Sequence, residues 1–167
     1  MNPPQLFLRF LPFWLVFLFL KGVLTGLIPL WYVDPTTALS LAFTLIWKFN
    51  LWALVGMLLL GLIRAFDGVY PLLFFASYYS ALLWLRNWGK RYFKEQSAYF
   101  PYLFWALAIL ILVFLELFLF FNRLSLYSLT YDFLLRLLLK SLFYALFTFL
   151  LTIAFYRLLK VIWDHES

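Results

Sequence analysis

A succession of long apolar segments, separated by short polar breaks, constrains this chain more than any other feature. The clearest segment runs from residue 101 to 121 and contains one charged residue, Glu116. A helix needs about 20 apolar residues to cross the hydrocarbon core of a bilayer. Hydrophobic residues make up 67% of the 167 residues and charged residues 12%, more apolar surface than a small soluble globule could bury. We therefore expect an integral membrane protein with no separate soluble domain.

Six of these segments are predicted to cross the membrane. Asp34 and Pro35 indicate the start of the second, because Asp caps unpaired backbone N–H groups and Pro suits the first helical position. Residues 36–66 as one helix would be about 46 Å long, which exceeds an ordinary crossing, so we divide them at residues 48–50. The predicted spans are residues 5–27, 36–47, 51–66, 71–87, 101–121 and 133–156. They make residues 1–167 a single transmembrane domain, an all-α six-helix bundle.

The orientation follows from the basic segment between Arg86 and Lys94. Cytoplasmic loops of membrane proteins carry an excess of Lys and Arg, so we place this segment in the cytoplasm. With six spans, both termini then also lie in the cytoplasm. The outer loops contain one basic residue, Arg123, and three acidic ones, Asp34, Asp67 and Asp132. Five spans, with residues 36–66 as one tilted helix and the N-terminus outside, remain the alternative.

The composition argues against several kinds of chemistry. The chain has no cysteine, and its one histidine, His165, lies three residues from the end, so thiolate and histidine sites are excluded. The candidate catalytic carboxylates, Glu116, Asp67 and Asp132, are not paired with a second carboxylate or a histidine, as general acid–base chemistry would favour. We expect no catalytic residues, no metal and no cofactor. The net charge of +6 is interpreted as topology and contact with lipid headgroups, with no nucleic acid as partner.

Charged residues within membrane spans usually face the interior of a bundle. A polar cluster is predicted in the outer half of this bundle, made of Lys21, Arg64, Asp67, Glu116, Arg136 and Lys140. Glu116 lies at a depth that would allow an ion pair with Lys140 or Arg136. The sixth span also carries a polar residue at every fourth position: Arg136, Lys140, Tyr144, Thr148 and Thr152. Residues four apart share one helix face, so we expect this face to meet protein or water.

Two interpretations of the polar cluster stay open. One is an ion pair between helices with neighbouring side chains that reach the interface. The other is a polar cavity open to the outside that takes a ligand or a segment of another protein. Small residues offer a separate kind of contact, since they let helices approach closely. Gly22, Gly26, Gly56 and Gly61 are candidates for helix packing or for binding a partner.

The order of these features resembles a known family. Gly56-Met-Leu-Leu-Leu-Gly61-Leu-Ile-Arg64-Ala-Phe-Asp67-Gly68 looks like the family's pair of glycines followed by an aspartate and a small-residue turn. Asp34-Pro35 matches its proline before the second span, and the stretch from Arg86 to Lys94 looks like its basic loop. On these residues the chain resembles MreD, the small membrane subunit of the bacterial rod-shape (elongasome) machinery.

The resemblance implies a non-enzymatic scaffold in the bacterial cytoplasmic (inner) membrane. MreD-like proteins bind the single-span protein MreC, and act with the actin-like MreB, RodA and a class B penicillin-binding protein in peptidoglycan synthesis. Their bundle is similar to the S-components of energy-coupling-factor transporters. The alternatives are therefore a solute-binding subunit of a vitamin transporter and, from the carboxylates named above, an intramembrane enzyme.

Overall fold

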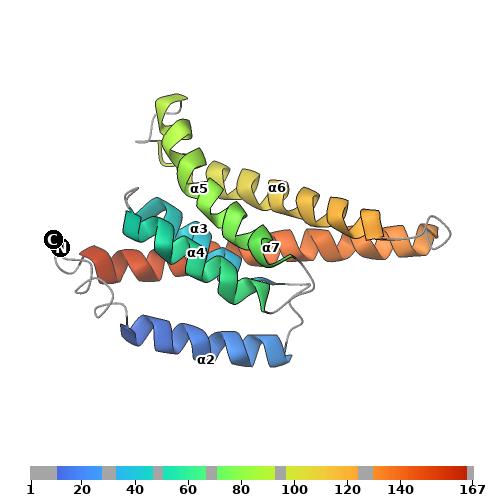
Figure 1. Ribbon diagram of the computed structural model, residues 1–167, viewed down its shortest axis with the longest axis horizontal. Coiled ribbons are helices and arrows are strands. Elements are labelled where there is room, and N and C mark those ends of the chain that lie inside the picture. Colours follow the sequence, from blue (N-terminus) through green and yellow to red (C-terminus); the bar gives the residue numbers. More distant parts are fainter. Residues whose placement is uncertain are drawn as a thin grey trace. The chain divides into compact units, whose positions relative to one another are not determined.

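The computed structural model describes residues 11–27, 33–46, 51–66, 71–92, 97–123 and 130–164. These residues form six α-helices and no strand, which confirms the predicted all-α class (Figure 1). The helices are α2 (Leu11–Leu27), α3 (Pro35–Ile46), α4 (Leu51–Ala65), α5 (Leu72–Tyr92), α6 (Phe100–Arg123) and α7 (Tyr131–Asp164). The chain divides into two compact units, Met1–Leu30 with α2 and Trp31–Ser167 with α3 to α7.

Helices α6 and α7 are long and apolar enough to cross a membrane. Helix α6 has 24 residues and helix α7 has 34, lengths of about 36 Å and about 51 Å at 1.5 Å per residue. Most of their large apolar side chains are exposed on the surface of the second unit, for example Phe114, Leu138 and Leu150. An apolar surface of this kind suits contact with lipid rather than water.

Helix α3 is the core of the second unit. Every residue from Pro35 to Thr44 is buried, and the helix lies against α4, α5 and α7. A helix that is apolar on all sides belongs in the interior. Two of its hydroxyl groups bond to its own backbone: Ser40 Oγ donates to the carbonyl of Thr36 over 2.8 Å, and Thr44 Oγ1 to that of Ser40 over 2.7 Å. These bonds remove the cost of burying the hydroxyls.

Residues 36–66 form the two separate helices α3 and α4, as the division at residues 48–50 predicts. Helix α4 packs closely on α5, and Gly61 is the reason. A Cβ atom added to Gly61 would collide with the backbone of Ala76 and come within 2.8 Å of the carbonyl carbon of Phe75. The absence of a side chain at Gly61 therefore sets the distance between the two helices.

Two helices continue beyond the ends of the predicted spans. Helix α5 continues from the predicted end at residue 87 to Tyr92, so the residues from Arg86 to Tyr92 lie on a helix and not in a loop. Helix α7 continues from 156 to Asp164 and carries Arg157 and Lys160. Charged and aromatic residues do not stop a helix, and basic residues are favourable in its last turn, as Lys90 and Arg91 are in α5. Charge marks the end of the apolar segment, and the helix runs on past it.

Candidate functional site

A buried ion pair stands at the centre of the second unit. Arg64 Nε, near the end of α4, donates to Asp34 Oδ2, just before α3, over 2.7 Å. The Asp34 side chain is fully buried and that of Arg64 is 5% exposed. The Arg64 guanidinium also lies over the ring of Phe75 on α5, 4.4 Å from its centroid, in a cation–π contact. The arginine thus joins α4 to α3 and α5.

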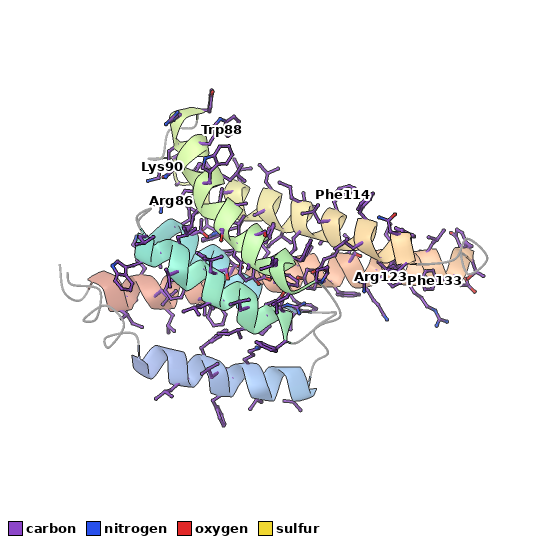
Figure 2. All side chains as sticks on the ribbon, viewed as in Figure 1. Arg86, Trp88, Lys90, Phe114, Arg123 and Phe133 are labelled. Carbon is purple, nitrogen blue, oxygen red and sulfur yellow. The ribbon has the colours of Figure 1, made fainter. Side chains whose placement is uncertain are left out.

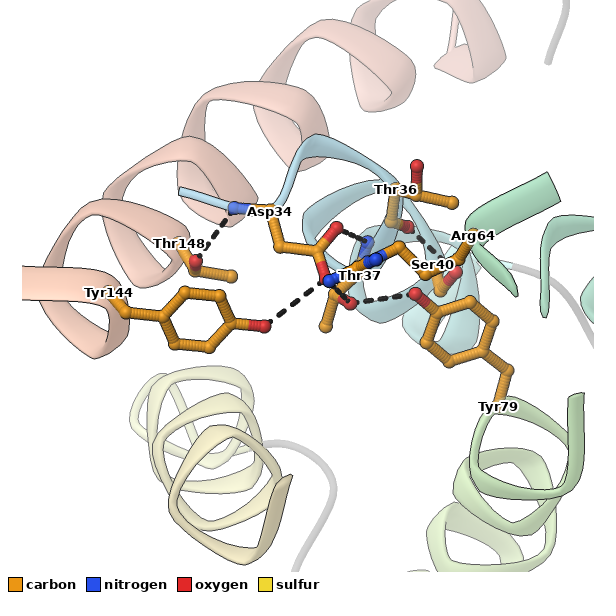
Figure 3. Close-up of polar contacts among 8 residues, drawn as sticks. All are labelled: Asp34, Thr36, Thr37, Ser40, Arg64, Tyr79, Tyr144 and Thr148. Carbon is orange, nitrogen blue, oxygen red and sulfur yellow. Dashed lines mark hydrogen bonds and ion pairs between the residues drawn. The ribbon is translucent and has the colours of Figure 1, made fainter. Parts of the chain in front are cut away.

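Asp34 accepts hydrogen bonds on both carboxylate oxygens (Figure 3). The backbone N–H of Thr37 donates to Oδ1 over 3.1 Å, and Thr37 Oγ1 donates to Oδ2 over 2.6 Å. The predicted N-cap of α3 is therefore confirmed. Tyr144 Oη, from α7, also donates to Oδ2, over 3.2 Å. A carboxylate bonded in this way is kept in its charged form within the protein interior.

Two further contacts extend this group to α5 and α7. Tyr79 Oη on α5 and Thr37 Oγ1 are 2.7 Å apart. The backbone N–H of Asp34 donates to Thr148 Oγ1 on α7 over 3.2 Å. In Figure 3, Tyr79 and Tyr144 approach the ion pair from opposite sides. We call this group the Asp34–Arg64 network, and it consists of Asp34, Thr37, Arg64, Tyr79, Tyr144 and Thr148. It links four helices at one point.

The pKa of Asp34 reflects its surroundings. Burial alone would raise it, because a charge is poorly solvated in the interior. The positive charge of Arg64 and the hydrogen bonds from Arg64 and Thr37 outweigh burial and hold the pKa of Asp34 below its ordinary value. The ion pair and these hydrogen bonds thus favour the charged form of Asp34.

Two hydrogen bonds connect α6 to the other helices of the second unit. Trp105 Nε1 donates to the backbone carbonyl of Leu41 on α3 over 3.0 Å, and Tyr78 Oη on α5 donates to the carbonyl of Ala108. The Trp105 ring also meets the ring of Tyr156 on α7 edge to face, with centroids 5.1 Å apart. All three contacts fall in the first half of α6.

Glu116 lies further along α6 and is only partly satisfied. Its Oε1 atom is buried and has no hydrogen-bond partner among the described residues, and the same holds for Arg64 Nη1. Glu116 interacts electrostatically with Asp34 and Arg64. The predicted ion pair of Glu116 with Lys140 or Arg136 is not present in the part of the chain that the structure describes. The ion pair of this site joins Arg64 to Asp34.

Not all other members of the predicted polar cluster belong to the second unit. Lys21 is on α2, in the first unit. Asp67 lies outside the described residues. Lys140 and Arg136 are on α7, one and two turns before Tyr144, where Lys140 is half-buried and Arg136 exposed. The rest of the predicted polar face is buried as expected: Tyr144, Thr148 and Thr152 all lie in the interior.

The candidate glycines also divide between the units. Gly22 and Gly26 are exposed on α2, and an added Cβ would meet no atom within 4 Å at either. Gly56 is buried on α4, and Gly61 packs on α5. Gly61 thus serves helix packing within the chain.

Sequence reasoning missed Asp34 as an ion-pair partner, as well as Thr37 and Tyr79. It assigned Asp34 only to capping. The signal was present, because Asp34 at the start of one span and Arg64 near the end of the next are opposite charges at one end of a predicted antiparallel pair.

The charged and hydroxyl groups of the site bond to one another. The carboxylate is neutralised by an arginine and surrounded by hydroxyl donors. Among the described residues, no group of three His, Cys, Asp or Glu side chains could hold a metal ion. Comparison with known proteins finds no matching family model, no matching curated protein and no matching solved structure.

Proposed function

We propose that this chain is a non-enzymatic scaffold of the MreD kind, spanning the bacterial inner membrane six times with both termini in the cytoplasm. Its partner is an MreC-like single-span membrane protein. Through that partner it supports the control of cell shape and peptidoglycan synthesis, with RodA, a class B penicillin-binding protein and MreB as further members of the assembly. The resemblance in sequence names these partners, and the contacts within the second unit support a scaffold.

The observation that carries the proposal is the Asp34–Arg64 network. Its two charges neutralise each other in the interior, and both tyrosines bond within the group. A catalytic group has to reach a substrate, whereas these groups bond to one another. Polar contacts between helices hold membrane bundles together, because apolar side chains gain little from association inside lipid. The network therefore suits a protein whose task is to hold a fixed shape for its partners.

The six-span arrangement is supported by the way the shortest helices are covered. Helix α3, with 12 residues, is only about 18 Å long, less than the hydrocarbon thickness of about 30 Å. A short helix at membrane depth is tolerated when its end is buried in protein. The start of α3 is buried in this way, since the Asp34 side chain caps the helix and the Asp34 backbone N–H bonds to Thr148.

Co-purification tests the proposal directly. The full-length chain, tagged and extracted from native membranes in mild detergent, should recover a single-span membrane protein with an outer domain. Loss of the gene should turn rod-shaped cells round. A chain that remains alone in every mild detergent, in cells whose shape does not depend on it, would contradict the scaffold.

One observation favours the second candidate, a solute-binding subunit similar to the S-components. Arg64 Nη1 and Glu116 Oε1 are a donor and an acceptor, both buried and without a hydrogen-bond partner among the described residues. Such atoms can mark a bound polar molecule. A ligand that binds only the folded protein raises its melting temperature. A vitamin that stabilises the purified chain, and not Glu116→Leu, would favour this candidate over the scaffold.

A further inference from the structure

Two buried atoms beside the Asp34–Arg64 network have opposite hydrogen-bonding needs. Arg64 Nη1 is a donor and Glu116 Oε1 is an acceptor, and neither has a hydrogen-bond partner among the described residues. The Arg64 side chain is 5% exposed, so this donor lies in the interior. Buried polar atoms are nearly always bonded. The donor and the acceptor therefore call for a partner that can bond to both.

Glu116 is placed on the side of α6 that faces the network. Phe114, two residues earlier, is 73% exposed, and Figure 2 shows it directed away from the neighbouring helices. Two residues turn an α-helix by about 200°, so Glu116 lies on the opposite side. In Figure 3, α6 (pale yellow) passes between α5 and α7 on one side of the ion pair. Glu116 accordingly interacts electrostatically with Arg64.

The charges of this region define one half of the partner. Asp34 and Arg64 neutralise each other, and Glu116 adds a second carboxylate to them. Within the described part of the chain, no ion pair joins Glu116 to a basic residue. A carboxylate in the interior is costly without a positive partner. The group that bonds to Glu116 Oε1 therefore has an N–H donor and a positive charge, which describes an ammonium group.

The guanidinium defines the other half. Arg64 Nη1 needs an oxygen acceptor, and a neutral oxygen such as a hydroxyl is sufficient because Asp34 already neutralises the arginine. A metal ion does not fit, since its charge would repel the guanidinium and it has no acceptor to offer. Both buried atoms lie beside the same ion pair, so one small molecule with an ammonium group and an oxygen can bond to both.

We propose that Glu116 and Arg64 bind a small amine of the aminoethanol class, whose ammonium group donates to Glu116 Oε1 and whose oxygen accepts from Arg64 Nη1. A free amino alcohol and the ethanolamine headgroup of a phospholipid share this chemistry. The inference goes beyond the scaffold function and needs no partner protein. It also names the class of ligand that the second candidate function leaves open.

The proposed ligand has a structural consequence for α6. The hydrogen bonds that connect α6 to α3 and α5 involve Trp105 and Ala108, both in its first half. Glu116 lies in its second half. A ligand held by Glu116 and Arg64 joins this second half to α4, so its binding stabilises the folded chain.

Thermal unfolding with three matched additives tests the ligand class. The full-length chain is purified in detergent and an amine-free buffer, and each additive is used at the same concentration and ionic strength. Ethanolamine has the ammonium group and the hydroxyl, n-propylamine lacks the hydroxyl, and ethylene glycol lacks the charge. We expect ethanolamine to raise the melting temperature by about 3–6 °C at about tenfold excess over its Kd. The rise with n-propylamine should be smaller, and ethylene glycol should have no effect.

Two variants locate the response. Glu116→Gln keeps the size of the side chain and removes its charge, so the ethanolamine shift should disappear. This variant should fold, because it removes a charge from the interior. Asp132→Asn is the matched control, since Asp132 is an exposed carboxylate at the start of α7. Its ethanolamine shift should equal that of the unchanged chain.

Two membranes separate the sources of the ligand. The chain is reconstituted into nanodiscs of phosphatidylglycerol with either phosphatidylethanolamine or phosphatidylcholine, whose quaternary ammonium has no N–H donor. If the ligand is the headgroup, the chain melts higher in phosphatidylethanolamine, and Glu116→Gln removes the difference. If it is a free amine, the chain melts equally in both membranes, and ethanolamine raises the melting temperature in each.

Three outcomes would overturn the proposal. The first is a shift that persists in Glu116→Gln. The second is an equal shift with ethanolamine and n-propylamine, which would exclude the contact with Arg64. The third is no response in detergent and no effect of amine or lipid in either membrane, which would show that water or another side chain of the protein bonds to the two atoms. Co-purification of a single-span protein involves no amine, so the scaffold and the amine site can fail separately.

Discussion

Arg64 Nε bonds to Asp34 Oδ2 over 2.7 Å across 30 residues of sequence, and both side chains lie in the protein interior. The pair joins the end of α4 to the start of α3, the most deeply buried helix of its unit. Tyr144 and Thr148 on α7 bond to the same aspartate. A single carboxylate therefore holds together helices that are more than 100 residues apart in the chain.

The first prediction concerns the loss of Arg64. In Arg64→Leu, Asp34 stays buried without its counter-charge, so we expect the free energy of unfolding to fall by about 3–5 kcal/mol. Asp34→Asn combined with Arg64→Leu should recover part of this loss, because no charge is then left unpaired. Unfolding by SDS in detergent micelles measures both. A full loss in the double variant would show that the charge itself is not the cause.

The second prediction concerns the close contact between α4 and α5. Gly61→Ala should destabilise the protein by about 1–3 kcal/mol, as overpacking of a tight interface does, because the added Cβ collides with the Ala76 backbone. Gly89→Ala is the matched control. There the added Cβ meets Phe100 Cε2 at 4.0 Å, an ordinary contact, and alanine is the better helix former. Equal melting temperatures for the two variants would contradict the packing role of Gly61.

Local signals explain what could be predicted from the sequence. Proline at position 35, the aspartate before it and the polar break at residues 48–50 act within a few residues of the places where α3 and α4 begin or end. The four-residue period of polar side chains likewise reflects a single helix, and Tyr144, Thr148 and Thr152 are buried together as that period implies.

The partners of charged residues could not be predicted in the same way. Depth along a span made Glu116 a candidate for Lys140, but depth does not specify which helix faces which. Asp34, at the start of α3, bonds to Tyr144 and Thr148 on α7 and also forms the ion pair with Arg64. That arrangement depends on a short helix packed inside the bundle, and each span considered by itself gives no indication of it.

The third prediction separates the hydroxyls of the network from its charges. Tyr144→Phe removes one of the donors to Asp34 Oδ2, and Tyr79→Phe removes one of the two partners of Thr37 Oγ1. Each change should lower the free energy of unfolding by about 0.5–1.5 kcal/mol. Tyr156→Phe is the control, because its ring contact with Trp105 survives the change. Thermal unfolding in detergent compares the three, and a control as damaging as Tyr144→Phe would argue against a specific hydroxyl role.

The last prediction tests the proposed topology with single cysteines, which the cysteine-free chain makes straightforward. We compare Lys90→Cys at the end of α5 and Lys160→Cys on α7 with Asn122→Cys at the end of α6 and Thr130→Cys just before α7. In six spans with cytoplasmic termini, a membrane-impermeant thiol reagent applied to intact cells should label positions 122 and 130. It should reach positions 90 and 160 only after the membrane is permeabilised. The opposite pattern would invert the orientation derived from the basic residues.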